Sequence, residues 1–272
     1  MNPRTALGAI SIFVAVATCC AAAAELQITQ RTQVLKPDAT GHNQWQVISS
    51  QKSLRAEDTA IIICDMWDKH WSRGASERVA VMAPRMNAVV KAARAKGVTI
   101  IHCPSETMAF YKDHAARKRM IEAPQTEMPK ERAHDDPPQP IDASDGGSDT
   151  GEAPWFRAWT RQHPAIEIDG QKDGISDDGQ EVWNFVKQKN VKNLIVMGVH
   201  TNMCVLHRPF AIKTMVRRGM NVFLVRDLTD AMYNPARPPY VSHAEGTRLV
   251  IEYIEKFWCP TITSEALLKG GS

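Results

Sequence analysis

The residues best suited to chemistry in this chain are a cysteine and an aspartate, each of which follows an apolar run. Cys204 ends the stretch NLIVMGVHTNMC, in which the pattern of a buried strand leads through Gly198 to the start of a predicted helix. Asp65 directly follows the apolar run TAIIIC. A thiol can attack a carbonyl carbon, and a carboxylate can accept the thiol proton and return it later. The two residues therefore predict nucleophilic catalysis if their strands are neighbours.

The predicted place of Cys204, at the first turn of a helix, suits this chemistry. The free amide N–H groups of a helix N-terminus carry partial positive charge, which would lower the pKa of the thiol and could later hold an oxyanion. In open parallel sheets, sites form beyond the carboxyl ends of the strands, where both residues are expected. The alternative is that Cys204 packs under the helix and Asp65 caps a loop.

The elements that must position these residues alternate between strands and helices. Helical spacing of apolar residues predicts helices at 76–96, 179–189, 203–218 and 242–257, and Ser242 and Glu245 have the spacing of a capping box at the start of the last one. Apolar runs predict strands at 59–64, 98–103, 165–168, 193–199, 221–225 and 260–263. This order predicts a single Rossmann-like α/β domain at residues 25–272, with a mostly parallel central sheet and helices on both faces.

Residues 122–152 interrupt the alternation. They are rich in Pro, Asp, Gly and Ser and show no periodicity, which predicts a long loop insertion of the kind that serves as a lid or stays disordered. Aromatic residues also follow the predicted strand ends. We expect these to line a substrate pocket, with core packing as the alternative for each: Trp67, Trp71, Phe110 and Tyr111.

The first 24 residues predict a signal peptide, with Arg4 as the positive charge, an apolar stretch after it and three alanines at 22–24 as the cleavage site. We therefore expect an exported protein, periplasmic or extracellular, with no membrane span in the rest of the chain. Without Arg4, 32 of the 33 Lys and Arg residues remain against 30 Asp and Glu, and this near balance gives no indication of nucleic-acid binding. Four cysteines follow the signal peptide, too few for a disulfide-stapled scaffold.

Four segments of the chain resemble the isochorismatase-like cysteine hydrolases, a superfamily that includes nicotinamidases and related amidases. The most specific part is the block G-V-x-T-N-x-C-V at residues 198–205. The resemblance implies a Rossmann-like sheet and an Asp-Lys-Cys triad, in which Asp65 and Cys204 hold the first and last places. It also implies a cis peptide bond between Val199 and His200, beside the oxyanion site at Cys204. The segments are TAIIICDMWDKHW, VTIIHCPSETM, NLIVMGVHTNMCVLHRPFAIKTMVRRGMNVFLVRDLTDA and YVSHAEGTRLVIEYIEKFWCPTITS.

The triad lysine has no direct counterpart in this sequence. In the family it follows the strand predicted at 165–168, and here that stretch reads IEIDGQKDGISDDG, so Lys172 is the nearest candidate and a solvated loop lysine is the alternative. Without Lys172, the thiolate would depend on the helix N-terminus and another cation, or the activity would be altered or lost. Nicotinamidases of the family hold a divalent ion through an Asp-x-His motif. Asp68 and His70 have that spacing but follow Asp65 too closely, so we predict no cofactor and retain these two residues as weak metal candidates.

Together these features predict an exported cysteine hydrolase that cleaves the C–N bond of a small amide through a thioester on Cys204. Two alternatives stay open: an isochorismatase-type hydrolase of a non-amide substrate, and a catalytically inactive secreted binding protein on the same fold. The expected partner is a small-molecule amide, and association into a homo-oligomer is a further expectation because members of the family often associate.

Overall fold

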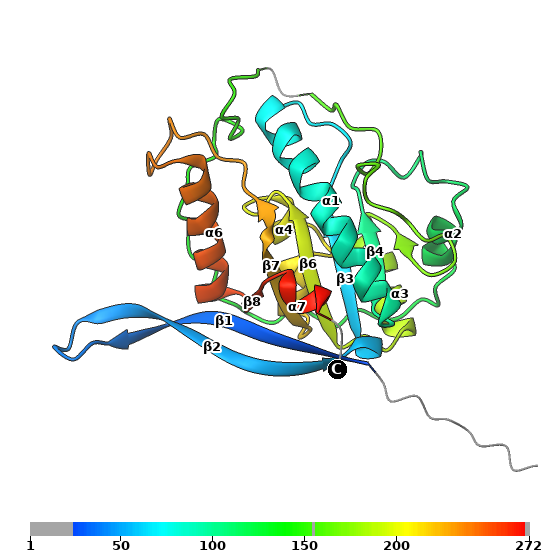
Figure 1. The fold of residues 1–272 in the computed structure, drawn as a ribbon, viewed down its shortest axis with the longest axis horizontal. Coiled ribbons are helices and arrows are strands. Elements are labelled where there is room, and N and C mark those ends of the chain that lie inside the picture. Colours follow the sequence, from blue (N-terminus) through cyan, green and yellow to red (C-terminus); the bar gives the residue numbers. More distant parts are fainter. Residues whose placement is uncertain (1–23, 154–155, 270–272) are drawn as a thin grey trace, which may run out of the picture.

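A computed structural model describes residues 24–153 and 156–269 of the chain (Figure 1). All but the last residue of the predicted signal peptide lies outside these residues. The strands are β1 Glu25–Pro37, β2 Asn43–Arg55, β3 Thr59–Cys64, β4 Thr99–Cys103, β5 Gly174–Ile175, β6 Asn193–Val199, β7 Asn221–Asp230 and β8 Thr261–Ile262. The helices are η1 Ala56–Asp58, α1 Arg73–Ala95, α2 Ala115–Ile121, α3 Gly179–Gln188, α4 Cys204–His207, α5 Ile212–Arg217, α6 His243–Phe257 and α7 Glu265–Leu268. Within the described residues, no helix combines the length and the apolar character needed to cross a membrane.

One sheet of eight strands runs through the protein in the order β2-β1-β8-β7-β6-β3-β4-β5. The six strands from β8 to β5 are parallel, and β1 pairs antiparallel with both β8 and β2. The predicted fold class, a mostly parallel α/β sheet, is confirmed. Because β3 lies between β4 and β6, Cys64 is paired with Cys103 on one side and Gly198 on the other. The residues that follow these strands therefore meet at one edge of the sheet.

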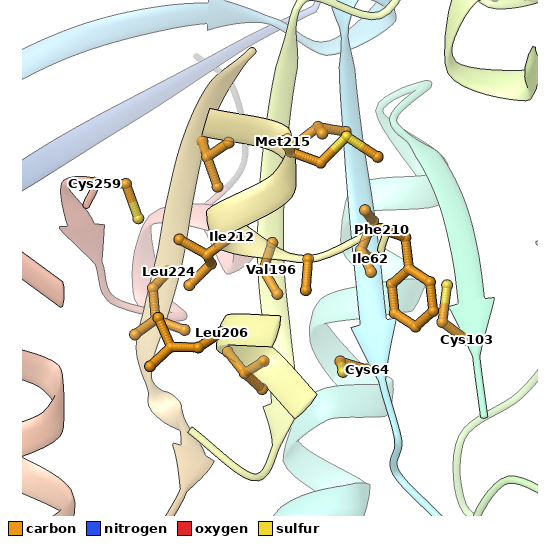
Figure 2. Close-up of a cluster of buried hydrophobic side chains, with 14 of the residues drawn as sticks. Ile62, Cys64, Cys103, Val196, Leu206, Phe210, Ile212, Met215, Leu224 and Cys259 are labelled. Atoms are coloured by element: carbon orange, nitrogen blue, oxygen red, sulfur yellow. The ribbon is translucent and has the colours of Figure 1, made fainter. Parts of the chain in front are cut away.

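Helices cover both faces of the sheet because the side chains of its central strands alternate between them. Ile61 and Ile63 of β3 pack in one apolar cluster with α1 and α7. Ile62 and Cys64 face the other way and pack in a second cluster with α3, α5 and α6. Figure 2 shows part of the second cluster, in which side chains of the segment from α4 to α5 lie over β3, β6 and β7. The sheet edge at which the residues after these strands meet thus belongs to strands that are buried on both faces.

Two predicted features differ from the structure, and one feature of the structure was not predicted. The chain does not form a strand at 165–168, where the Glu167 amide N–H donates to the side chain of Asn87 instead of to another strand. The strand beside β4 is instead β5, a few residues later. The helix predicted at 203–218 is two helices, α4 and α5, with Pro209 in the break. The long hairpin of β1 and β2, which extends away from the domain in Figure 1, was not predicted.

Candidate active site

Cys204 is positioned by the turn that connects β6 to α4. The peptide bond between Val199 and His200 is cis, at the position that the family resemblance implied. Residues at and just after the end of β7 hold this turn. The Thr201 amide N–H donates to the Asp230 carbonyl oxygen at 2.8 Å. The Asn202 side chain donates to the Met232 carbonyl oxygen and accepts from the Met232 amide, each at 2.9 Å. Cys204 is then the first residue of α4 and is partly exposed.

Asp65 lies beside Cys204 at the end of β3 and is completely buried. Its backbone has a φ of 46°, which turns the chain sharply after the strand. Gly198 permits the close approach of the two strands, because a Cβ atom there would lie 2.0 Å from the Cys64 carbonyl oxygen. The Asp65 carboxylate and the Cys204 thiol lie close enough for each to shift the pKa of the other. The structure therefore brings together the thiol and the carboxylate that the sequence singled out.

The cation at this site is Arg208, which the sequence analysis did not identify. Its Nε donates to Asp65 Oδ2 at 2.9 Å, while the Ser105 amide N–H donates to Asp65 Oδ1 at 2.7 Å. Arg208 follows Cys204 by four residues, so one helical turn places both side chains over Asp65. That spacing was the signal available in the sequence, and the family resemblance drew attention to Lys172, which precedes Cys204, instead.

Lys172 does not join this group. It lies exposed in the loop before β5, its amide N–H donates to the side chain of Asp169, and it lines neither cavity at Cys204. The loop is oriented by Asp173, whose buried carboxylate binds Arg94 and His102. The sequence prediction of Lys172 as the triad lysine thus has no support from its position, and a guanidinium from the opposite side takes the place next to Asp65.

Burial dominates the acid–base balance of the site. It raises the pKa of Asp65, and the Arg208 cation and the Ser105 hydrogen bond act in the opposite direction. Burial, together with the Asp65 charge, raises the pKa of the Cys204 thiol well above its ordinary value, while Arg208 and the hydrogen bond from the His200 amide lower it. The expected lowering of the thiol pKa by a helix N-terminus is therefore outweighed by burial and by the Asp65 charge. The resting side chain is a thiol beside an ion pair.

A cavity of about 200 Å³ opens at the sulfur. Trp67 and Trp71 line it as predicted, and Trp159 stacks on Trp67 with ring centroids 4.2 Å apart. The two imidazoles in the wall are neutral near pH 7, because burial lowers the pKa of His70 to about 4 and that of His200 to about 3. The remaining lining residues are Glu106, Gly146, Met203, Cys204, Arg208 and Met232. This cavity is called the chamber.

The other two predicted pocket residues lie elsewhere. Phe110 is exposed, with the guanidinium of Arg161 over its ring at 5.5 Å. Tyr111 is buried in a small cluster with Ile175, and its hydroxyl accepts a hydrogen bond from the Gln162 amide at 2.9 Å. Both follow β4 by several residues, so the chain has already moved away from the strand end when it reaches them.

The two metal candidates are held by protein groups. The Asp68 carboxylate accepts hydrogen bonds from the amide and hydroxyl of Thr160 and from the Arg161 amide, and His70 Nδ1 accepts one from the Ser72 amide. Among residues 24–153 and 156–269, no group of three or more His, Cys, Asp or Glu side chains is arranged to hold a metal ion. The arrangement of these two side chains does not fit a divalent cation, and no step of the proposed reaction uses one.

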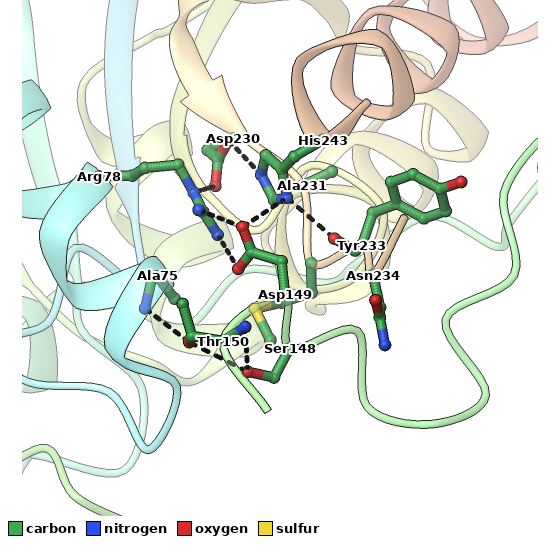
Figure 3. A network of polar contacts seen from close by, with 12 residues as sticks. Ala75, Arg78, Ser148, Asp149, Thr150, Asp230, Ala231, Tyr233, Asn234 and His243 are labelled. Carbon is green, nitrogen blue, oxygen red and sulfur yellow. Dashed lines mark hydrogen bonds and ion pairs between the residues drawn. The ribbon is translucent and has the colours of Figure 1, made fainter. Parts of the chain in front are cut away.

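The chamber is covered by part of the long loop, residues 143–152, called the lid segment here. Gly146 lies against Trp71, and Gly147 is pressed on the backbone of Met232. The lid segment is tied down through Asp149, which accepts two hydrogen bonds from Arg78 of α1 at 2.9 and 3.1 Å (Figure 3). Arg78 also donates to Asp230 at 2.7 Å, so one guanidinium joins the lid segment to α1 and to the end of β7. A small substrate would be enclosed between this segment and the sheet edge.

His243 completes the lid attachment from the start of α6 (Figure 3). Its Nε2 lies 3.0 Å from Asp230 Oδ1, and its Nδ1 lies 2.9 Å from the Tyr233 carbonyl oxygen and 3.5 Å from Asp149 Oδ2. Both ring nitrogens therefore face oxygen acceptors, and only the imidazolium can donate to both. The hydrogen bond with Asp230 accordingly raises the pKa of His243, against burial and the charge of Arg78.

A family model for the isochorismatase domain matches residues 59–238, about two thirds of the chain. No curated protein sequence matches it. A solved cysteine hydrolase from Pseudomonas syringae pv. phaseolicola is 17% identical with a TM-score of 0.51, over 79% of this chain and 92% of that chain. An isochorismatase family protein from Burkholderia thailandensis is 13% identical with a TM-score of 0.46, over 78% of this chain and 96% of that chain. The first of these structures shares the fold of the described residues.

Proposed function

Because this chain belongs to the isochorismatase family, whose members are hydrolases, we propose that it cleaves the C–N bond of a small amide through a thioester on Cys204. The observation that carries the proposal is the contact of three side chains at the floor of the chamber. The Asp65 carboxylate interacts with the Cys204 thiol, and Arg208 Nε donates to Oδ2 of that carboxylate at 2.9 Å. A nucleophile, a proton acceptor and a cation that orients the acceptor are thus in contact.

The proposed reaction has two displacement steps. Asp65 takes the thiol proton as Sγ attacks the amide carbonyl carbon, and the amide N–H groups of His200 and Cys204 would donate to the oxyanion. Asp65 then gives the proton to the departing nitrogen, the C–N bond breaks, and an amine and a thioester result. Water attacks the thioester, with Asp65 again accepting a proton, which releases the acid and restores the thiol. General acid–base help of this kind contributes roughly 10²–10⁴-fold.

The charges of the chamber favour a neutral amide over the non-amide alternative. The walls are three indoles, two thioethers and two neutral imidazoles, and the Arg208 charge is balanced by Asp65. The Glu106 carboxylate at the rim adds a negative charge. A dianionic substrate such as isochorismate would meet no uncompensated cation among the lining residues. The inactive binding protein is disfavoured by Arg208, which supplies the cation whose absence motivated that alternative.

Replacement of the nucleophile tests the proposal. Cys204→Ala should abolish the release of amine or ammonia from a panel of small amides, while the wild-type protein should gain the mass of one acyl group when the reaction is stopped early. Cys259→Ala is the matched control, because Cys259 is a buried cysteine that lines neither the chamber nor its surroundings. Normal turnover by the Cys204→Ala variant would exclude the mechanism.

A further inference from the structure

A second hollow borders Cys204 on the side away from the chamber. It is an open groove of about 530 Å³ that runs along α4. Three residues line both spaces, namely Met203, Cys204 and Arg208. The groove is completed by Asn202, His207 and Pro209. The reactive sulfur therefore lies between two spaces, and a substrate held at its carbonyl carbon can extend into both.

The two spaces differ in a way that matches the two halves of an amide. The chamber is the more enclosed of the two spaces and is lined by indoles, so a group held there is less accessible to water than one in the groove. The groove is open to solvent. In a thioester mechanism the amine must leave and water must enter while the acyl group stays in place, which requires the amine half to lie on the open side. An acyl half in the chamber and an amine half in the groove satisfy this order of events.

Polar groups along the groove can hold an amine substituent. The Nδ1 of His207 lies 2.9 Å from the Met203 carbonyl oxygen and is therefore the protonated nitrogen, which leaves Nε2 as an acceptor in the neutral ring. Burial lowers the pKa of His207, so the ring is neutral near pH 7. The Nε of Arg208 is used by Asp65, and its two terminal nitrogens have no hydrogen bond to any of the described residues. The groove thus offers one acceptor and a set of donors beside the sulfur.

We propose that the substrate is an N-substituted amide, whose acyl group occupies the chamber and whose amine substituent lies in the groove against His207 and Arg208. This inference rests on the proposed function and names the substrate class for the same site. A primary amide would release ammonia, which needs no groove. A space of this size falls in the range of small-molecule pockets, roughly 300–1,000 Å³.

Alkylation of Cys204 tests the groove without requiring the natural substrate. The probes are 2-iodoacetamide and N-butyl-2-iodoacetamide; in each, a bond forms between Sγ and the methylene carbon, the carbon–iodine bond breaks, and the thiol proton is lost to Asp65 or water. Labelling rates of Cys204, measured by mass spectrometry, are divided by the rates of free glutathione with the same probe. We expect the normalised rate of the butyl probe to equal or exceed that of the parent probe. A butyl probe that is 10-fold slower would overturn the proposal.

A groove-filling variant provides the second arm. His207→Trp should slow the butyl probe at least 10-fold and leave 2-iodoacetamide within 2-fold of wild type. His42→Trp is the matched control, because His42 is exposed in the hairpin turn and should change neither rate. Equal slowing of both probes by His207→Trp would also overturn the proposal, because the groove would then not discriminate.

Turnover of benzamide and N-butylbenzamide separates this inference from the function on which it rests. A higher kcat/KM for N-butylbenzamide, reduced by His207→Trp, is expected. If benzamide is preferred and its hydrolysis requires Cys204, the groove proposal fails and the amidase proposal stands. If neither amide reacts and His207→Trp slows both probes equally, both the groove proposal and the choice of amide substrates are wrong.

Discussion

Removal of the Arg208 guanidinium should show how much its ion pair with the buried Asp65 carboxylate contributes to the free energy of unfolding. At 2.9 Å, two unit charges attract by about 6 kcal/mol at an effective dielectric constant of ~20, and part of this is offset by desolvation of the ions. Loss of one partner of a buried pair costs about 3–5 kcal/mol. Because 29% of the Arg208 side chain is exposed, we take the lower end, about 3 kcal/mol, for the loss of unfolding free energy in Arg208→Met at pH 8.

The pH dependence of this loss has a defined sign. Without Arg208, burial raises the pKa of Asp65 further, since the cation that opposed it is gone. A carboxyl group whose pKa is raised on folding lowers stability as the pH increases from its unfolded pKa toward its folded pKa. The variant should therefore lose less at pH 5, where Asp65 takes up a proton, than at pH 8. If the transition state also loses about 3 kcal/mol of stabilisation, kcat/KM should decrease roughly 100-fold.

Urea unfolding followed by tryptophan fluorescence at pH 5 and pH 8 measures the stability change. Arg85→Met is the matched control, because Arg85 forms a 3.3 Å pair with Asp227 and is 60% exposed, so its loss should cost below about 1 kcal/mol. Arg208→Lys keeps the charge without the Nε geometry and should fall between wild type and Arg208→Met in both stability and activity. If Arg208→Met costs no more than Arg85→Met at pH 8, the reasoning about the buried pair is wrong.

Three further predictions concern the lid segment and the strands. The protonated form of His243 adds stability that is complete below pH 6.5 and is lost as the pH rises through its raised pKa, so the Tm measured between pH 6 and 9 should fall, and His243→Gln should remove this component. Gly147→Ala places a Cβ 2.5 Å from the Met232 carbonyl oxygen in a left-handed backbone, so the lid segment should shift and KM should increase with little change in Tm. Gly198→Ala would set a Cβ 2.0 Å from the Cys64 carbonyl oxygen, and we expect a loss of more than about 3 kcal/mol in urea unfolding; a smaller loss would mean that β3 and β6 can separate.

The central strands and the last long helix could be predicted because local sequence decides them. The runs at β3 and β6 are apolar after their first residue and buried at every position, as strands covered on both faces require, and their predicted bounds agree with the structure. Ser242 accepts a hydrogen bond from the Glu245 amide at 3.2 Å, as the capping spacing predicted for α6. Pro209 shows the limit of periodicity: apolar spacing continues across it, while the missing amide hydrogen breaks the helix.

The rest depended on contacts between distant segments. The run at 165–168 looks like a strand, yet only Ile166 is well buried, and it packs with the α1 side of the sheet. Polar residues alternate along the hairpin. Its apolar contact with the core is short and is made at Leu26 and Ile28 of β1. The cation at Asp65 could not be chosen by sequence position, because only the three-dimensional path of the chain shows that Arg208 contacts Asp65 and that Lys172 lies in an exposed loop away from it.

The tip of the β1–β2 hairpin offers a place to attach a foreign group. Its turn, residues 38–42, is exposed and is closed by Asp38, which accepts hydrogen bonds from the amides of Thr40 and His42. The sheet holds β1 through one residue pair with β8, between Arg31 and Thr261, well before the tip. Exposed turns of this kind tolerate inserted peptides. An affinity tag or a fluorophore placed there would leave the chamber, the groove and the lid segment untouched, which gives a means to immobilise the enzyme in the labelling experiments.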